Sequence, residues 1–177
     1  MVPSCKKIDG NICFLRPMTE GDVPRWTKWF SDPTILEYSV HRTAKTNENK
    51  QLSFLYENNK DPLKLQLAIC APSKELLGVI SMQFKDATLY EGDISIIIGE
   101  KSYWGKGIAT DAISVLVKYV STHYDTKIFT AGCDIRNKGS ERSFLKCGFS
   151  REGVIVDAIS YSDEDTLYDM IKLGLHT

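Results

Sequence analysis

The sequence has almost no excess charge of either sign, with a formal net charge of −1 at pH 7 over 177 residues. This near balance gives no electrostatic case for nucleic acid or an anionic membrane as a general partner. No apolar run approaches the roughly twenty residues that a transmembrane helix needs. The first residues, MVPSCKKIDGN, contain no hydrophobic stretch typical of a signal peptide. We therefore expect a cytoplasmic protein that binds neither nucleic acid nor membrane.

Cysteine is scarce: the five cysteines are an odd number and none forms a Cys-x-x-Cys pair. This argues against both a disulfide framework and a zinc site, and it fits a reducing compartment. The three histidines, His41, His123 and His176, are too scattered to suggest a metal centre. Repeats and low-complexity segments are absent too. A hydrophobic content of 42% over this length predicts a single globular domain, residues 1–177, with a full core.

One stretch, from Glu91 to Val120, organises the rest of the chain. Its apolar residues recur with a period of two up to Ile98 and with a period of about 3.6 after Gly107, which predicts a strand, a turn and a helix. The first N–H groups of a helix lack internal partners and carry partial positive charge, so they bind anions. Glycines let a ligand approach the backbone closely. We therefore predict a phosphate or pyrophosphate on the amides of Trp104, Gly105, Lys106, Gly107, Ile108 and Ala109.

The residues in this turn distinguish between classes of phosphate ligand. A Walker loop needs Ser or Thr after its lysine, but Lys106 is followed by Gly107. A dinucleotide fold has a third glycine three residues after the second, and Thr110 stands there. These departures argue against a nucleotide-binding α/β protein. A Gly-x-Gly pair also occurs in ordinary turns, so the turn alone leaves open that these glycines bind no ligand.

Two blocks resemble those of a known family. Gly105, Gly107 and Ala109 match motif A of the GNAT superfamily of acyl-CoA-dependent N-acetyltransferases, with Ser102 in place of its leading Gln or Arg. The segment 137–149 resembles motif B, which has an asparagine, a small residue three positions later and a closing Gly-Phe. The segment LRPMTEGDVPRWTKWFSDP looks like the opening of the branch with ribosomal-protein and amino-sugar acetyltransferases.

The resemblance covers nearly the whole chain and implies the GNAT fold. This is an α/β fold with a mixed sheet, mostly antiparallel, with one splayed parallel strand pair and flanking helices. Acetyl-CoA is the implied co-substrate, without a metal, and its pantetheine arm is expected between the splayed strands. Besides the turn, the implied coenzyme contacts are Ile97, Ile98, Asn137, Ser140 and Phe144. Asn137 also suits a helix N-cap, and both roles are compatible.

Acetyl transfer to an amine requires a polarised carbonyl and a neutral amine. A backbone N–H of Ile97 or Ile98 is expected to polarise the carbonyl. Many relatives use a tyrosine seven residues after the motif B asparagine as the acid for the leaving thiolate, but Phe144 stands there. Asp93 is the candidate base; a solvent-facing carboxylate at a strand end is the alternative. Cys133 and Cys147 are expected to pack in the core rather than to carry an acetyl group.

The acceptor side of the site is expected in the connection from Ile35 to Asn47. In the family this region lines the acceptor, which makes Glu37 and Tyr38 candidate substrate-binding residues; a solvated connection is the competing interpretation. The preferred hypothesis is direct acetyl transfer, in a ternary complex, to a primary amine on a small molecule or peptide, such as an amino sugar or a protein N-terminus. The alternative is a non-catalytic acyl-CoA-binding regulatory domain. Because dimers are frequent in the superfamily, a homodimer is the oligomer to test.

Overall fold

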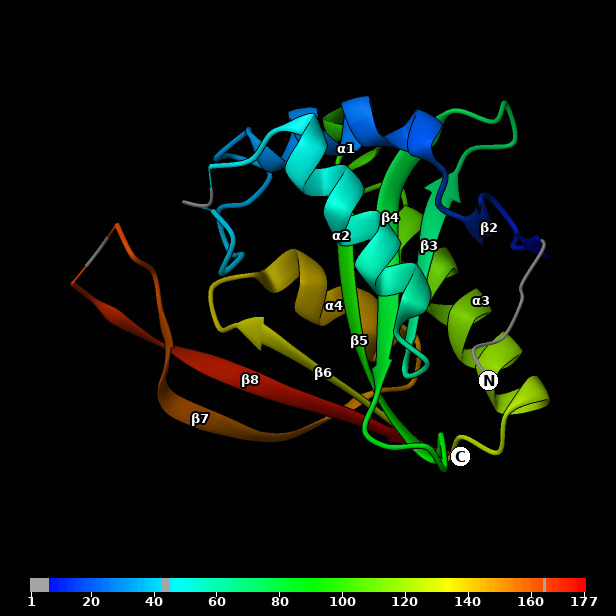
Figure 1. Cartoon of the computed structure of the whole chain (residues 1–177). Helices are drawn as coiled ribbons and strands as arrows, with labels where there is room; N and C mark the ends of the chain where they lie inside the picture. Colours follow the sequence, from blue (N-terminus) through cyan, green and yellow to red (C-terminus); the bar gives the residue numbers. More distant parts are fainter. Residues whose placement is uncertain (1–6, 43–44, 164) are drawn as a thin grey trace.

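The computed structural model describes residues 7–42, 45–163 and 165–177. Across these residues one sheet of eight strands runs in the order β1-β2-β3-β4-β5-β6-β8-β7, with helices against both faces (Figure 1). The strands are β1 (Ile8–Asp9), β2 (Phe14–Pro17), β3 (Lys64–Cys70), β4 (Leu76–Phe84), β5 (Glu91–Ile98), β6 (Ile128–Asp134), β7 (Ser150–Ser160) and β8 (Leu167–His176). The α-helices are α1 (Val23–Phe30), α2 (Glu48–Lys60), α3 (Ile108–His123) and α4 (Lys138–Lys146), with 3-10 turns at Glu20–Asp22 and Lys101–Tyr103.

These elements follow the order that the sequence patterns predict. The strand, turn and helix predicted from Glu91 to Val120 form β5, the 3-10 turn at Lys101–Tyr103 and α3. Part of the predicted connection 35–47, residues 43–44, lies outside the described residues. Within the described chain, no helix combines the length and the apolar character needed to cross a bilayer.

Two apolar clusters occupy the two faces of the sheet. The larger lies between the sheet and helices α3 and α4, and includes Ile80, Ile94, Leu116, Phe129 and Phe144. The smaller lies under α1 and α2, and includes Trp26, Trp29, Leu55 and Val79. Because side chains alternate along a strand, Ile94 of β5 faces α3 while its neighbour Asp93 faces the α1–α2 side. The two faces of β5 therefore have different environments.

The strands β5 and β6 form the parallel pair of the sheet, and they separate. Their pairing runs through Glu91–Ile128, Gly92–Phe129 and Asp93–Thr130. Beyond these three rungs β5 continues to Ile98 and β6 to Asp134 without pairing to each other. All other strand pairs are antiparallel. The prediction of a mostly antiparallel sheet with one splayed parallel pair is confirmed.

Candidate active site

The glycine turn lies between β5 and α3, and the N–H groups of Gly105 and Gly107 donate to no acceptor among the described residues. The other two predicted amides of the turn are occupied, since Trp104 donates to the C=O of Lys101 at 3.0 Å and Lys106 to the C=O of Tyr103 at 3.3 Å. Gly105 and Gly107 have φ values of +73° and +84°, which L side chains rarely adopt. A Cβ built on Gly105 would meet no atom within 4 Å. Gly107 is the N-cap of α3, and since it has no side chain, the first N–H groups of the helix receive no side-chain acceptor. This arrangement suits an anion such as the coenzyme pyrophosphate.

Two side chains flank the turn. The Trp104 side chain is 47% exposed, and its Nε1 donates to the C=O of Ile98 at 2.8 Å. The indole therefore ties the turn to the last residue of β5. Lys106 is exposed, with its Nζ 5.5 Å from the ring centroid of Tyr103.

A buried carboxylate anchors the loop between β1 and β2 beside this turn. Asp111, in the first turn of α3, accepts the backbone N–H groups of Asn11, Ile12 and Cys13 at 2.9–3.1 Å. Burial opposes ionisation of Asp111, but these hydrogen bonds outweigh it and hold its pKa below the usual value. The Ile12 side chain lies 3.6 Å from a Cβ built on Gly107, so this loop borders the predicted phosphate site.

The hydrogen-bond alternation of β5 identifies the backbone groups that face the opening. In an antiparallel ladder, alternate residues direct both their N–H and C=O groups to the partner strand. At one end Lys85 donates to the C=O of Glu91, and at the other Gly99 donates to Leu77, so odd-numbered residues face β4. The N–H of Ile97 therefore points to β4, so the prediction of Ile97 as the carbonyl donor is wrong, whereas Ile98, the other residue predicted for this role, faces the opening. The groups of Ile94, Ile96 and Ile98 face the opening.

Asp93 lies where β5 and β6 diverge, on the α1–α2 face. One carboxylate oxygen, Oδ1, accepts the Thr130 hydroxyl at 2.8 Å. Water reaches the side chain, but protein atoms crowd the carboxylate, and this partial desolvation raises its pKa. The Thr130 bond opposes that rise, and the negative charge of Glu91 adds to it. A carboxylate of raised pKa inside the opening has the chemistry of a general base.

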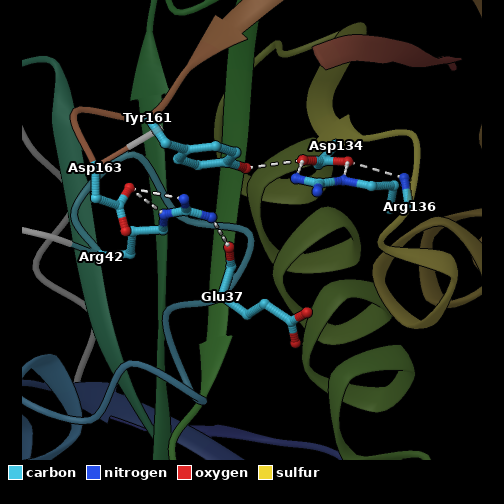
Figure 2. Close-up of polar contacts among 6 residues, drawn as sticks. All are labelled: Glu37, Arg42, Asp134, Arg136, Tyr161 and Asp163. Carbon is cyan, nitrogen blue, oxygen red and sulfur yellow. Dashed lines mark hydrogen bonds and ion pairs between the residues drawn. The ribbon is translucent and has the colours of Figure 1, made fainter. Parts of the chain in front are cut away.

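The connection after α1 packs against the tip of the β7–β8 hairpin. Arg42 reaches Asp163 at 2.7 Å and the backbone C=O of Glu37 at 3.3 Å, and only 10% of its side chain is exposed. Its guanidinium lies 3.9 Å from the ring centroid of Tyr161. In Figure 2 the Glu37 carboxylate extends away from Arg42. Leu36 is fully buried while Glu37 and Val40 are exposed, so this part of the connection forms a wall that packs against the hairpin on one side and meets solvent on the other.

Tyr38 belongs to the same wall. Its ring lies 5.5 Å from the guanidinium of Arg136, at the far end of β6. Partial desolvation raises the pKa of the Tyr38 hydroxyl, and a hydrogen bond to the neighbouring Glu37 raises it further. Tyr38 thus lies close to the end of β6, and acceptor binding by Glu37 and Tyr38 stays a prediction.

A buried ionic cluster at the end of β6 supports this wall (Figure 2). Asp134, which is 1% exposed, accepts two bonds from the Arg136 guanidinium at 2.9 and 2.6 Å and one from the Tyr161 hydroxyl at 2.9 Å. Burial alone would raise the pKa of Asp134, but these donors lower it. The Arg136 guanidinium also lies 3.4 Å from the ring centroid of Tyr168. The cluster links β6 to the hairpin that Arg42 contacts.

Motif B folds as the helix predicted for it. Asn137 is the N-cap of α4, and its side-chain oxygen accepts the N–H of Ser140 at 3.1 Å. Gly148 ends the helix with φ +89°. Phe144 is 2% exposed and packs edge-on against Phe149 in the core. It offers almost no surface to a coenzyme, so we correct its predicted contact to a packing role.

The cysteines near the site are packing residues, as expected. Burial raises the pKa of Cys133 to about 11, so its thiol is neutral at pH 7. Cys147 is half-buried, donates to the C=O of Thr110 at 3.2 Å and also has a raised pKa. Neither thiol is activated as a nucleophile. In the described part of the chain, no three His, Cys, Asp or Glu side chains gather as metal ligands.

Comparison with known proteins identifies the family. Residues 13–150 match the description "Acetyltransferase (GNAT) domain". The chain belongs to the GNAT acetyltransferase family. Membership makes it an acyltransferase of the N-acetyltransferase class, as the sequence resemblance implied.

A curated relative, an N-acetyltransferase 9-like protein from Nematostella vectensis, is 27% identical over 151 residues, covering 80% of this chain and 76% of the relative. Spermidine N-acetyltransferase from Vibrio cholerae, solved with CoA and spermine, superposes with a TM-score of 0.83 at 17% identity, covering 93% and 95% of the two chains. RimL, a ribosomal L7/L12 α-N-protein acetyltransferase solved with coenzyme A, gives a TM-score of 0.83 at 17% identity, covering 99% and 97%. These structures share the fold.

Several residues of the site escaped sequence reasoning. Thr130, Arg42 and Tyr161 act through partners between 27 and 121 residues away, which no local pattern reveals. Ile96 was missed because the period-two pattern shows which side chains share a face but not which N–H groups face which neighbour. The strand-to-helix turn, by contrast, was visible because all its parts are consecutive in sequence.

Proposed function

We propose that the protein transfers an acetyl group from acetyl-CoA to a primary amine, directly, in a ternary complex. The observation that carries the proposal is the unpaired edge of β5. Past the Asp93–Thr130 rung, no strand of the described chain pairs with this edge from Ile94 to Ile98. It leads to the Gly105–Gly107 turn, where the N–H groups of Gly105 and Gly107 donate to no acceptor among the described residues. A pantetheine arm with its pyrophosphate matches that combination of an extended edge and an anion site.

The backbone performs most of the binding in this proposal. The N–H groups of Gly105 and Gly107 and of the first turn of α3 hold the pyrophosphate, and the N–H of Ile98 donates to the pantetheine arm, while the Ile98 C=O keeps its bond to the Trp104 indole. The N–H of Ile96, two residues deeper in the opening, donates to the thioester carbonyl and stabilises the negative charge that develops there. Both N–H groups are held in place by the β4–β5 ladder, so little reorganisation is needed on binding.

Asp93 removes the proton from the attacking amine, directly or through one water. It stands on the α1–α2 face of the sheet, the same face as Trp29 and Leu55 and the side on which the acceptor wall would present the amine. The N–H bond of the amine breaks as its nitrogen attacks the carbonyl, and the C–S bond then releases the thiolate. Since Phe144 has no proton to give, solvent or the proton taken from the amine neutralises that thiolate.

The acceptor enters opposite the coenzyme, against the wall formed by Glu37, Tyr38 and the β7–β8 hairpin. The exposed Glu37 carboxylate suits a cationic amine awaiting deprotonation. Among fold neighbours, one is named for spermidine and one for a ribosomal protein α-amine. A protein N-terminus or an amino sugar is our proposed acceptor class, in a cytoplasmic enzyme.

The first experiment is thermal melting with and without acetyl-CoA, with NADH and ATP as controls. Ligand at a hundred times its dissociation constant adds about 2.7 kcal/mol of stability. The expected result is a rise of several degrees with acetyl-CoA alone. A rise with a control nucleotide alone would refute the proposal. Thiol release from acetyl-CoA across a panel of amines then distinguishes an enzyme from a non-catalytic coenzyme-binding domain. Such a domain would show a higher melting temperature with acetyl-CoA but would release no thiol.

A further inference from the structure

The point where β5 and β6 diverge is held by one side-chain hydrogen bond. The Thr130 hydroxyl of β6 donates to Oδ1 of Asp93 on β5 at 2.8 Å, across the last rung of the parallel pair. We propose that Thr130 is a positioning residue that orients the Asp93 carboxylate toward the amine. This inference rests on the proposed function, because it deepens the role of the proposed base.

The geometry of the pair favours this role over a purely structural one. With Oδ1 engaged by Thr130, Oδ2 has no protein donor among the described residues and is left to accept the proton. Threonine is branched at Cβ and stiff at χ1, so its hydroxyl holds one direction. The Asp93–Thr130 rung is the last pair before β5 and β6 separate, so the orientation of Asp93 depends on both strands. A change in their separation therefore moves the carboxylate.

The same bond adjusts the acidity of Asp93. Partial desolvation raises its pKa, the Thr130 bond lowers it, and Glu91 on the same strand raises it. Glu91 is itself paired with Lys85 at 2.8 Å, which weakens its field. The residue opposite Asp93 on β4 is the uncharged Gln83, and on β6 it is the uncharged Thr130. Thr130 is thus the nearest group that favours the charged form.

The test compares Thr130→Val, which removes the donor at similar volume, with Thr130→Ser, which keeps it. The carboxyl titration is followed by 13C NMR of aspartate-labelled protein, and the Asp93 signal is assigned by its loss in Asp93→Asn. Loss of a hydrogen bond to the charged form raises a carboxyl pKa, here by about half to one pH unit in Thr130→Val. Thr130→Ser is expected to titrate as the wild type does. An unchanged titration in Thr130→Val overturns the inference.

Kinetics separate positioning from folding. In Thr130→Val, kcat is expected to fall about three- to tenfold, a part of what a general base contributes, while KM for acetyl-CoA stays unchanged. Adding Thr130→Val to Asp93→Asn should cost no further activity, because the threonine acts through the carboxylate. Additive losses in the double variant overturn the inference and leave the base assignment standing. Wild-type turnover in Asp93→Asn would instead overturn the proposed base, which distinguishes the two failures.

Discussion

The buried cluster at the end of β6 yields a quantitative prediction. Tyr161→Phe deletes the hydroxyl that donates to Asp134 at 2.9 Å and keeps the ring, which is 2% exposed and faces the Arg42 guanidinium. A hydrogen bond to a charged group contributes about 1.5–3 kcal/mol, and here the acceptor is buried away from water. The two Arg136 bonds remain, so the carboxylate keeps its charge partner. We expect unfolding free energy to fall by about 2 kcal/mol.

The assay is equilibrium urea unfolding at pH 7, read as a lower midpoint with an unchanged m-value. Tyr90→Phe is the matched control, since the Tyr90 ring is 48% exposed and its loss of a hydroxyl should change stability little. A loss below about 0.5 kcal/mol in Tyr161→Phe, the scatter typical of surface substitutions, would show that the hydroxyl does not stabilise the cluster. Because the cluster supports the acceptor wall, KM for the amine should rise while acetyl-CoA affinity stays constant.

Three further predictions concern the coenzyme end. Gly107→Ala places a Cβ at φ +84° and should lower stability by about 1 kcal/mol and weaken acetyl-CoA binding. The control Gly153→Ala, in open space at ordinary φ, should change neither. Thermal melting measures the stability and calorimetry the binding. Asp111→Asn should cost about 1–3 kcal/mol at pH 7. The pKa of Asp111 is lowered in the folded protein, so the stability difference between wild type and Asp111→Asn should be largest above the ordinary value of 3.8. It should disappear as pH falls through the folded pKa, and urea midpoints measured against pH test this. Gly99→Ala would put a Cβ 1.9 Å from the Trp29 ring and should lower the melting temperature markedly.

The order of elements followed from local patterns. The change of period after Gly107 predicted α3, and the caps at Asn137 and Gly148 predicted α4. The parallel crossover of β6 follows from one helix separating two strands. These signals are readable because each helix or strand buries one face of a few consecutive residues.

The contacts between distant segments were not readable in this way. The Arg42–Asp163 pair spans 121 residues, and the Asp111 carboxylate holds N–H groups about a hundred residues earlier. Their partners are set by how the elements pack, and an aspartate has the same local sequence signal whether it faces solvent or a buried amide. Phe144 illustrates the converse: its motif position suggested a coenzyme contact, but its apolar ring is buried in the core.

The two alternating sets of residues on β5 separate the backbone donors that face the opening from the side chains on the α1–α2 face. Side chains and backbone groups of a strand both alternate with a period of two. On β5 a residue whose side chain faces α1 and α2 directs its N–H to β4, and its neighbours do the reverse. On β5 the residues that present N–H groups to the opening, Ile96 and Ile98, therefore direct their side chains into the core under α3. Asp93 shows the complementary arrangement, with its carboxylate on the acceptor face and its N–H directed to β4. In the proposed mechanism the strand therefore supplies the oxyanion donor from one set of residues and the base from the other, and we expect a substitution at Asp93 to change proton transfer without removing the N–H groups that face the opening.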